Sequence, residues 1–228
     1  MMSNTVFSRG QSGADRSELV MLLLYSLPVT VLAVICIYYV DRPISLFVQS
    51  QLYSGTIWSN LTSKLPDILL MVVVIISAVS YLLYLFRKVK HVYDSITFLL
   101  RFVAITLPVS FIGKSLSKLV FGRIETRFWL QDPQQYGFHW FYGGSQYSGF
   151  PSGHMVVFTT LIAAIWRFYP QHKKILCSSL AVLGTLLIAT NYHFLSDVIC
   201  GAYLGLLIEA LMFFIMKQRW NKNSLVHC

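Results

Sequence analysis

Six long apolar runs constrain this chain more than any other feature of its sequence. They are Leu19 to Val40, Pro66 to Phe86, Ile96 to Val120, Met155 to Phe168, Ile175 to Tyr192 and Val198 to Met216. Because roughly 20 helical residues cross a hydrocarbon core of about 30 Å, all but the short fourth run match a membrane span. Only 12% of the residues are charged, too few to cover a soluble exterior. The sequence therefore predicts an all-α, polytopic membrane bundle of six transmembrane helices.

Basic residues are divided unequally between the two sets of loops that six spans define. One side receives Arg9, Arg16, Arg87, Lys88, Lys90, Arg167, Lys173, Lys174, Lys217, Arg219 and Lys222. The other side receives Arg42, Lys64, Lys118, Arg123 and Arg127. Because Lys and Arg near span ends are retained in the cytoplasm, both termini are expected on the cytoplasmic side. The net charge of +9 does not indicate a nucleic acid partner, because the basic residues are spread over the inner loops.

The chain shows no internal repeat and no sign of a second domain. Residues 18–217 are expected to form one membrane domain, between a flexible cytoplasmic leader at 1–17 and a cytoplasmic tail at 218–228. The first apolar run lacks a clear small-residue cleavage site, so we interpret it as a span and not as a signal peptide. Neither a disulfide nor a zinc site is expected from the spacing of Cys36, Cys177, Cys200 and Cys228.

Two outer segments have a distinctive composition. Gly122 to Gly149, the longest connection, is rich in aromatic residues and glycine. It suits either an aromatic belt at the headgroup level or the rim of an opening through which a lipid reaches a site. The apolar spacing of Ile44 to Tyr53 predicts a short helix on the outer surface.

Polar and ionisable residues collect near the outer ends of three runs. These residues are Lys118, Arg123, Arg127, Ser152, His154, His193 and Asp197. An ionisable group near the bilayer centre costs about 2.5 to 3.5 kcal/mol or more, so each such residue needs a reason. Their convergence at one membrane depth indicates a functional site.

Two local patterns suggest what this site does. Pro151 and Ser152 are good residues for starting a helix, and Gly153 lets a ligand approach the backbone. A helix N-terminus attracts anions, so it would cradle phosphate oxygens with His154 beside them. His193 and Asp197 are four residues apart, which places both on one helical face. The carboxylate would then orient the imidazole and leave its other nitrogen free to act as a nucleophile.

Residues 151–154 read Pro-Ser-Gly-His, and His193 and Asp197 are separated by three residues, with Lys118 preceding both motifs. With these motifs the segment from Lys118 to Gly205 resembles the type 2 phosphatidic acid phosphatase family. Its members include bacterial lipid A, undecaprenyl diphosphate and phosphatidylglycerophosphate phosphatases. The resemblance implies that His193 attacks phosphorus, that His154 protonates the leaving group, and that water hydrolyses the phosphohistidine.

The same resemblance implies a set of phosphate ligands in place of a metal or other cofactor. Lys118, Arg127, Ser152 and the Gly153 amide would hold the phosphate oxygens. The chain departs from the family at two places. The family's Arg-Pro pair falls on Glu125-Thr126, and Leu187 occupies the position of an arginine in the last motif. Candidate replacements for the missing arginine are Arg123, Arg127 and the amide of Asn191.

Two further basic residues, Arg101 and Lys114, lie within the third run. Arg101 and Glu209 sit at similar heights above the inner ends of their spans, so they form either a buried ion pair or two separate snorkelling side chains. Lys114 lies one turn below Lys118 and either extends the basic patch or snorkels outward.

The expected substrate is a phosphorylated membrane lipid, hydrolysed at the outer face; for a bacterial source this is the periplasmic face of the inner membrane. Three alternatives belong beside it. A lipid-to-lipid phosphotransferase would share the site, and a non-catalytic binder or transporter of anionic lipid would share the basic patch. A rhomboid-like intramembrane serine protease is disfavoured, because Ser152 is not set in Gly-x-Ser-Gly. The sequence does not specify the lipid or the oligomeric state.

Overall fold

The computed structural model describes residues 11–52 and 65–226, and within these ranges the chain is helical with no β-strand. The long helices are α1 (Gln11–Leu24), α2 (Ser26–Ile35), α3 (Asp41–Leu52), α5 (Leu65–Val89), α6 (Ser95–Phe121), α8 (Gly153–Phe168), α9 (Lys173–Ala189) and α10 (Leu195–Val226). A π-helical turn (Cys36–Val40) joins α2 to α3. The outer loop adds α7 (Thr126–Gln131), and single 3-10 turns cover Pro133–Gln135, Ser145–Tyr147 and Pro170–His172. The all-α prediction is confirmed.

Five helical stretches of the described chain are long and apolar enough to cross a membrane. They are Asp15–Gln51, Ile68–Val89, Ser95–Phe121, Pro170–Ala189 and Leu195–Arg219. The fourth predicted run forms α8, which at 16 residues is shorter than the others. The chain is therefore an integral membrane protein, whereas the count of six spans and the side on which the termini lie stay predictions.

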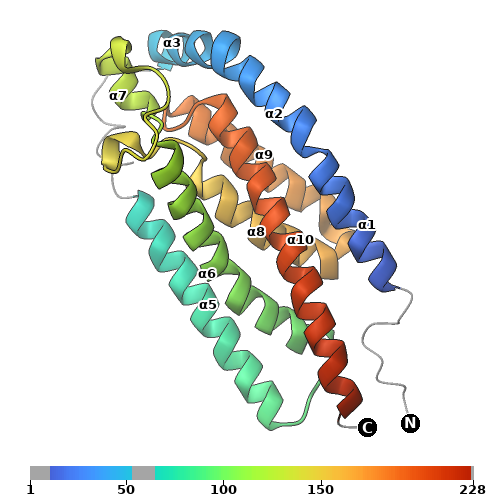
Figure 1. Cartoon of the computed structure of the whole chain (residues 1–228). Coiled ribbons are helices and arrows are strands. Elements are labelled where there is room, and N and C mark those ends of the chain that lie inside the picture. The colour runs from blue at the N-terminus through green and yellow to red at the C-terminus, as the bar shows by residue number, and fades with distance from the viewer. Residues whose placement is uncertain (1–10, 53–64, 227–228) are drawn as a thin grey trace.

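The helices form an elongated bundle whose two ends differ. Figure 1 shows α5 and α6 side by side, α8 and α10 packed next to them, and α1 and α2 running along α10. α3 turns across one end of the bundle, where α7 also lies. It includes residues 44–52 of the outer helix that the sequence predicted, and Tyr53 lies outside the described residues. At the opposite end Lys217 of α10 pairs with Asp15 of α1 at 2.5 Å. Helix α1 thus begins before the expected domain boundary at residue 18, and α10 continues beyond 217.

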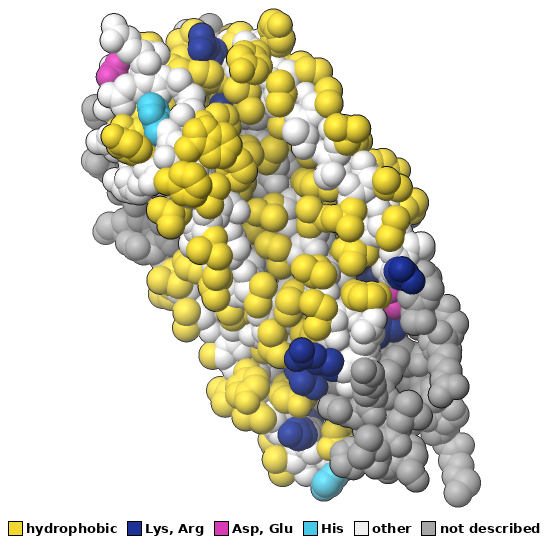
Figure 2. All heavy atoms as spheres, viewed as in Figure 1, with side chains coloured by type: hydrophobic (Ala, Val, Ile, Leu, Met, Phe, Trp, Pro, Cys, Tyr) yellow, Lys and Arg dark blue, Asp and Glu magenta, His cyan; other side chains and the backbone are white. Residues whose placement is uncertain are grey.

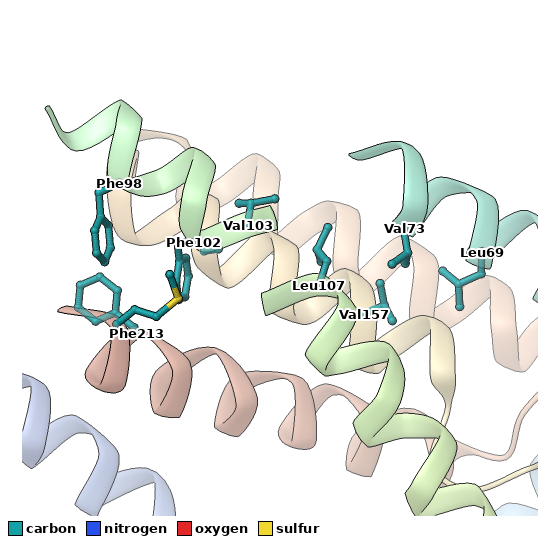
Figure 3. Close-up of a cluster of buried hydrophobic side chains, with 10 residues drawn as sticks. Leu69, Val73, Phe98, Phe102, Val103, Leu107, Val157 and Phe213 are labelled. Carbon is teal, nitrogen blue, oxygen red and sulfur yellow. The ribbon is translucent and has the colours of Figure 1, made fainter. Parts of the chain in front are cut away.

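The apolar core lies between α5, α6, α8 and α10. The ring of Phe213 meets Phe98 and Phe102 edge-on, at centroid distances of 5.9 and 5.8 Å (Figure 3). Val73 of α5 and Val157 of α8 extend the same cluster. Edge-to-face aromatic pairs add about 0.5 to 1.5 kcal/mol beyond their burial, so this cluster fixes how the four helices pack.

Helix α6 has a capped start and an enforced end. The Asp94 carboxylate accepts a hydrogen bond from the Thr97 amide at 2.9 Å and pairs with Arg87 at 2.6 Å. Burial alone would raise the pKa of Asp94, but the hydrogen bonds from Thr97 and Arg87 outweigh it and hold that pKa below its usual value. At the other end Gly122 has φ 54°, and a side chain there would meet the His139 carbonyl oxygen. Gly122 therefore ends the helix and turns the chain into the outer loop.

The end of the bundle opposite α3 carries a partly buried charge cluster. Arg167 of α8 pairs with Glu209 of α10 at 2.7 Å and with Glu18 of α1 at 2.8 Å. Of the two alternatives for Arg101 and Glu209, the ion pair is excluded, because Glu209 bonds Arg167 while the Arg101 guanidinium lies over the Tyr84 ring. Height along a helix did not reveal which partner shares its face. Figure 2 shows hydrophobic side chains over most of the visible face, with Lys and Arg gathered mainly towards this end.

Candidate active site

Three segments meet at the end of the bundle that α3 crosses: the end of α6, the start of α8 and the turn from α9 into α10. The Ser152 amide donates a hydrogen bond to the Asp197 carbonyl at 3.0 Å, which ties α8 to α10. Helix α10 can approach the start of α8 so closely because Gly201 has no side chain at the contact. A methyl group at Gly201 would lie 2.6 Å from the Ser152 carbonyl oxygen and 2.9 Å from Met155 Cβ.

This close approach predicts a defect for Gly201→Ala. The added methyl must push α10 away from α8, and overpacking of this kind costs about 1 to 3 kcal/mol. The variant is expected to melt at a lower temperature than the wild type and to lose part of the phosphatase activity that the sequence resemblance predicts, measured by thermal unfolding and phosphate release in detergent. Gly143→Ala is the control, because a methyl there meets only Leu119 Cδ1 at 3.8 Å. Full activity and an unchanged melting temperature for Gly201→Ala would show that the contact is relaxed.

The two predicted catalytic histidines border one tyrosine ring. The Tyr192 ring centroid lies 5.0 Å from that of His193 and 5.6 Å from that of His154, both edge-on. Both imidazoles are buried, with 2% exposure for His193 and 8% for His154. Within the described chain neither ring nitrogen of His193 has a hydrogen-bond partner. A buried imidazole without a partner is costly unless a ligand or water completes it, as at a reaction centre.

Asp197 lies beside His193, but the two do not share a helical face as predicted, because His193 is in the turn before α10 and Asp197 is in its first turn. Its Oδ2 is 3.7 Å from His193 Nδ1, beyond hydrogen-bond range, and accepts a hydrogen bond from the Phe194 amide at 3.0 Å. Its Oδ1 is held by Arg123 at 2.5 Å. Catalytic hydrogen bonds are often long in a structure without substrate, so this arrangement suits an orienting acid. The carboxylate is fixed by its other contacts before any ligand binds.

Arg123 was expected among the phosphate ligands, and the structure assigns its guanidinium to carboxylates instead. One terminal nitrogen bonds Asp197 and Ser196, and the other bonds Asp41 at 2.7 Å and the Tyr136 hydroxyl at 3.1 Å. The side chain is 0% exposed. Burial would lower the pKa of Arg123, but the two carboxylates raise it above its already high usual value. Arg123 stays charged, and both of its terminal nitrogens are occupied by partners other than a phosphate.

Asp41 and Ser196 are members of this network that the sequence did not reveal. The Asp41 carboxylate accepts hydrogen bonds from the Ser196 amide at 3.0 Å and from its hydroxyl at 2.5 Å. Asp41 begins α3, directly after the π-helical turn, and is fully buried. Its position after a long apolar run was the one available signal, because a lone acid there needs a partner.

Lys118 and Arg127 lie near the histidines on two different elements. The Arg127 guanidinium donates to the Thr190 carbonyl at 3.1 Å and lies 5.0 Å from the Tyr192 ring centroid. Lys118, in the last turn of α6, is within electrostatic range of the Glu125 and Asp197 carboxylates. Burial raises the pKa of Tyr192 to about 12, with Glu125 adding to the shift and Arg127 opposing it. The phenol therefore stays neutral, and the positive charge near it comes from Arg127.

The predicted anion cradle would lie at the start of α8, where the structure has the helix beginning as expected. Gly153 is the first residue of the helix and Ser152 precedes it in an extended conformation. The Ser152 hydroxyl makes no capping bond, is fully buried and has no hydrogen-bond partner among the described residues. The free amides of the first helical turn and this hydroxyl suit a phosphate oxygen.

Asn191 and Leu187 both contact other helices of the bundle and stabilise its packing. The Asn191 amide nitrogen donates to the Ser45 carbonyl of α3 at 3.2 Å, so Asn191, expected as a substitute ligand, anchors α3. Leu187 packs with Met155 and Val198 in an apolar cluster. The position of the family's arginine is thus filled by hydrophobic contacts. In the described chain no group of three or more His, Cys, Asp or Glu side chains could hold a metal.

Aromatic rings from the outer loop pack over the end of α6. Phe121 meets Phe150 at 4.8 Å and Trp140 at 5.2 Å between centroids, and Phe138 joins them. Trp140, Phe141 and Tyr142 remain exposed. Part of the loop is therefore a packed lid on α6, and the exposed rings suit the headgroup level of a membrane.

Comparison with known proteins identifies the class. The family model of the PAP2 superfamily matches residues 98–221, more than half of the chain. The chain therefore belongs to the PAP2 superfamily, the type 2 phosphatidic acid phosphatases, and membership implies phosphatase activity on phosphate esters. It is an integral membrane phosphatase by family and fold. No curated protein and no solved structure matches the chain.

Proposed function

We propose that this phosphatase hydrolyses a phosphate monoester or diphosphate on a membrane lipid, at the non-cytoplasmic face, through a phosphohistidine on His193. One observation carries the proposal: His193 is 2% exposed, has both ring nitrogens without a hydrogen-bond partner in the described chain, and lies beside Asp197. A buried, unpartnered imidazole next to a fixed carboxylate is what a histidine nucleophile requires.

The mechanism begins with in-line attack of His193 Nε2 on phosphorus. Asp197 then stabilises the positive imidazole through Nδ1, which needs the 3.7 Å separation to shorten slightly. His154 donates a proton to the departing lipid oxygen, or to the departing phosphate of a diphosphate. Water next cleaves the nitrogen–phosphorus bond, with His154 taking its proton. This releases inorganic phosphate and restores both histidines.

Charge on the transferring phosphoryl group is stabilised by groups around the start of α8. Lys118 and Arg127 supply positive charge, and the Ser152 hydroxyl and Gly153 amide supply hydrogen bonds. Such fixed donors act strongly because the site is buried. Arg123 serves this chemistry indirectly, by holding Asp197 in place.

The membrane side is proposed from charge distribution. The site lies at the α3 end of the bundle. Arg87 lies in the last turn of α5, Lys173 at the start of α9 and Lys217 in the C-terminal part of α10, all away from that end. Cytoplasmic retention of basic residues places that other end inside. For a bacterial cell the site then faces the periplasm from the inner membrane.

A panel of lipid substrates tests the proposal directly. Purified protein in nanodiscs is given lipid A, polyprenyl diphosphate, phosphatidylglycerophosphate and phosphatidic acid, and released phosphate is measured. We expect turnover of at least one of them without an added acceptor lipid, which separates hydrolysis from phosphotransfer. Trapping with radiolabelled phosphate is expected to give an acid-labile, base-stable phosphoenzyme. Absence of both release and phosphoenzyme across the panel would reject the proposal.

A lipid binder without turnover is the second candidate, and two observations favour it. Leu187 puts apolar contacts at the position of the family's arginine, and Glu125 brings a carboxylate near Lys118. Both changes weaken anion stabilisation. If the protein is only a binder, its wild-type and His193→Ala forms should bind anionic lipid with the same affinity, and neither form should release phosphate.

A further inference from the structure

Lys114 is a buried cation that the proposed mechanism does not use. It lies on α6, one turn before Lys118, and is 8% exposed. Its neighbours Ile112 and Leu116 are each 58% exposed and mark the outward face of the helix. The ammonium group therefore does not snorkel outward, and Lys114 points into the bundle.

The Lys114 side chain lies against the start of α8. A methyl group at Gly153 would sit 2.8 Å from Lys114 Cδ and 3.5 Å from its Nζ. The lysine thus fills the space that a side chain at Gly153 would need. Its ammonium group ends beside the first residue of the helix whose free amides form the anion cradle.

Within the described chain the Lys114 ammonium has no hydrogen-bond acceptor and no carboxylate partner. It lies 4.0 Å from the Phe111 ring centroid, and the charged group that acts on it is Lys118, of the same sign. The ring stabilises the ammonium group in part, but burying a charge without a counterion is costly, and like charges one helical turn apart repel each other.

An anion between the two lysines removes both costs. The Ser152 hydroxyl, also buried and without a partner in the described chain, lies in the same region and offers one more donor. Lys114 lies beside Gly153, next to the proposed proton donor His154. Leu187 occupies the position where the family usually has an arginine, so that cation is absent here.

We propose that Lys114 is a phosphoryl ligand of this site and supplies the positive charge that is missing at Leu187. It binds the substrate's phosphate oxygens together with Lys118, Ser152 and the Gly153 amide. The inference rests on the proposed function for its substrate, but the binding of a phosphoryl group can be measured without turnover.

The test compares Lys114→Met with wild type, using inorganic phosphate as the probe and thermal unfolding in detergent as the readout. Phosphate is expected to raise the wild-type melting temperature, because a ligand stabilises the state that binds it. Lys114→Met is expected to melt at or above wild type without phosphate, since a buried unpartnered charge has gone. Its Kd for phosphate should rise at least about tenfold, the effect of losing one charge-assisted hydrogen bond. Lys114→Arg should restore part of the affinity, and the exposed Lys88→Met should match wild type.

The outcomes separate this inference from the proposed function. Phosphate binding that depends on Lys114, without hydrolysis of any lipid, would uphold the inference and reject the enzyme. Hydrolysis with an increased KM in Lys114→Met would uphold both. A Kd for phosphate within twofold of wild type in Lys114→Met, or no phosphate-induced stabilisation of the wild type, would overturn the role of Lys114. A lower melting temperature for Lys114→Met with phosphate binding retained would make the lysine structural.

Discussion

His193→Ala is expected to lower kcat/KM for phosphate release from lipid by at least about 10³-fold, because removal of a nucleophile stops the covalent route. Residual activity would come from binding and charge stabilisation by the remaining donors. The loss should be in kcat, since the imidazole makes its bond to phosphorus only as the reaction proceeds. Phosphate release by purified protein at saturating and limiting lipid measures the two parameters.

His172→Ala is the matched control for this loss. His172 lies in the exposed 3-10 turn before α9, at the end of the bundle away from the site. Its removal should leave kcat/KM unchanged. The His193→Ala protein should still fold and should melt only moderately below wild type, because the imidazole has no hydrogen-bond partner to lose in the described chain but leaves a cavity when it is removed. A His193→Ala enzyme that retains more than a tenth of wild-type activity would exclude the phosphohistidine route.

Arg123→Met is expected to destabilise the protein by about 3 to 5 kcal/mol, since it leaves two buried carboxylates without their cation. Asp41 and Asp197 would repel each other and either take up protons or draw in water. The melting temperature in detergent should fall well below wild type. Activity should fall as well, because Asp197 loses the contact that fixes its orientation.

Two variants distinguish loss of this network from loss of any nearby arginine. Arg42→Met removes an exposed guanidinium that lies 4.1 Å from the Tyr136 ring centroid, and should cost no more than about 1 kcal/mol. Adding Asp41→Asn to Arg123→Met removes one of the unpaired charges and should recover part of the stability. If Arg123→Met has the same melting temperature as Arg42→Met, the buried network contributes little to the stability of the protein.

The sequence predicted the parts of the site that lie within one continuous segment. The spacing of His193 and Asp197 predicted that they are neighbours, which the structure shows, but not on one helical face, because His193 lies in the turn before α10 and Asp197 in the first turn of that helix. The start of a helix at Gly153 followed from the residues before it. Such local patterns carry their own geometry, which is why they could be read without coordinates.

Contacts between distant segments were the part that the sequence could not supply. Arg123 looked like a phosphate ligand because its partner Asp41 lies on a helix far earlier in the chain. An Arg101–Glu209 ion pair stayed among the alternatives because helical rise gives height but not the direction of a side chain. The amide of Asn191 faces α3, in a turn where the residue has φ 48°. Each error concerned which neighbour a polar group finds after folding.

Asp41 makes the proposed catalytic site depend on residues that the family match does not include. The PAP2 match begins at residue 98, yet half of the carboxylate charge around Arg123 comes from the helix that starts at Asp41. A protein cut back to the matched region would keep every motif residue and still leave the arginine that steadies Asp197 with a single counterion. Activity should therefore require the N-terminal helices in the same polypeptide or added back as a separate peptide.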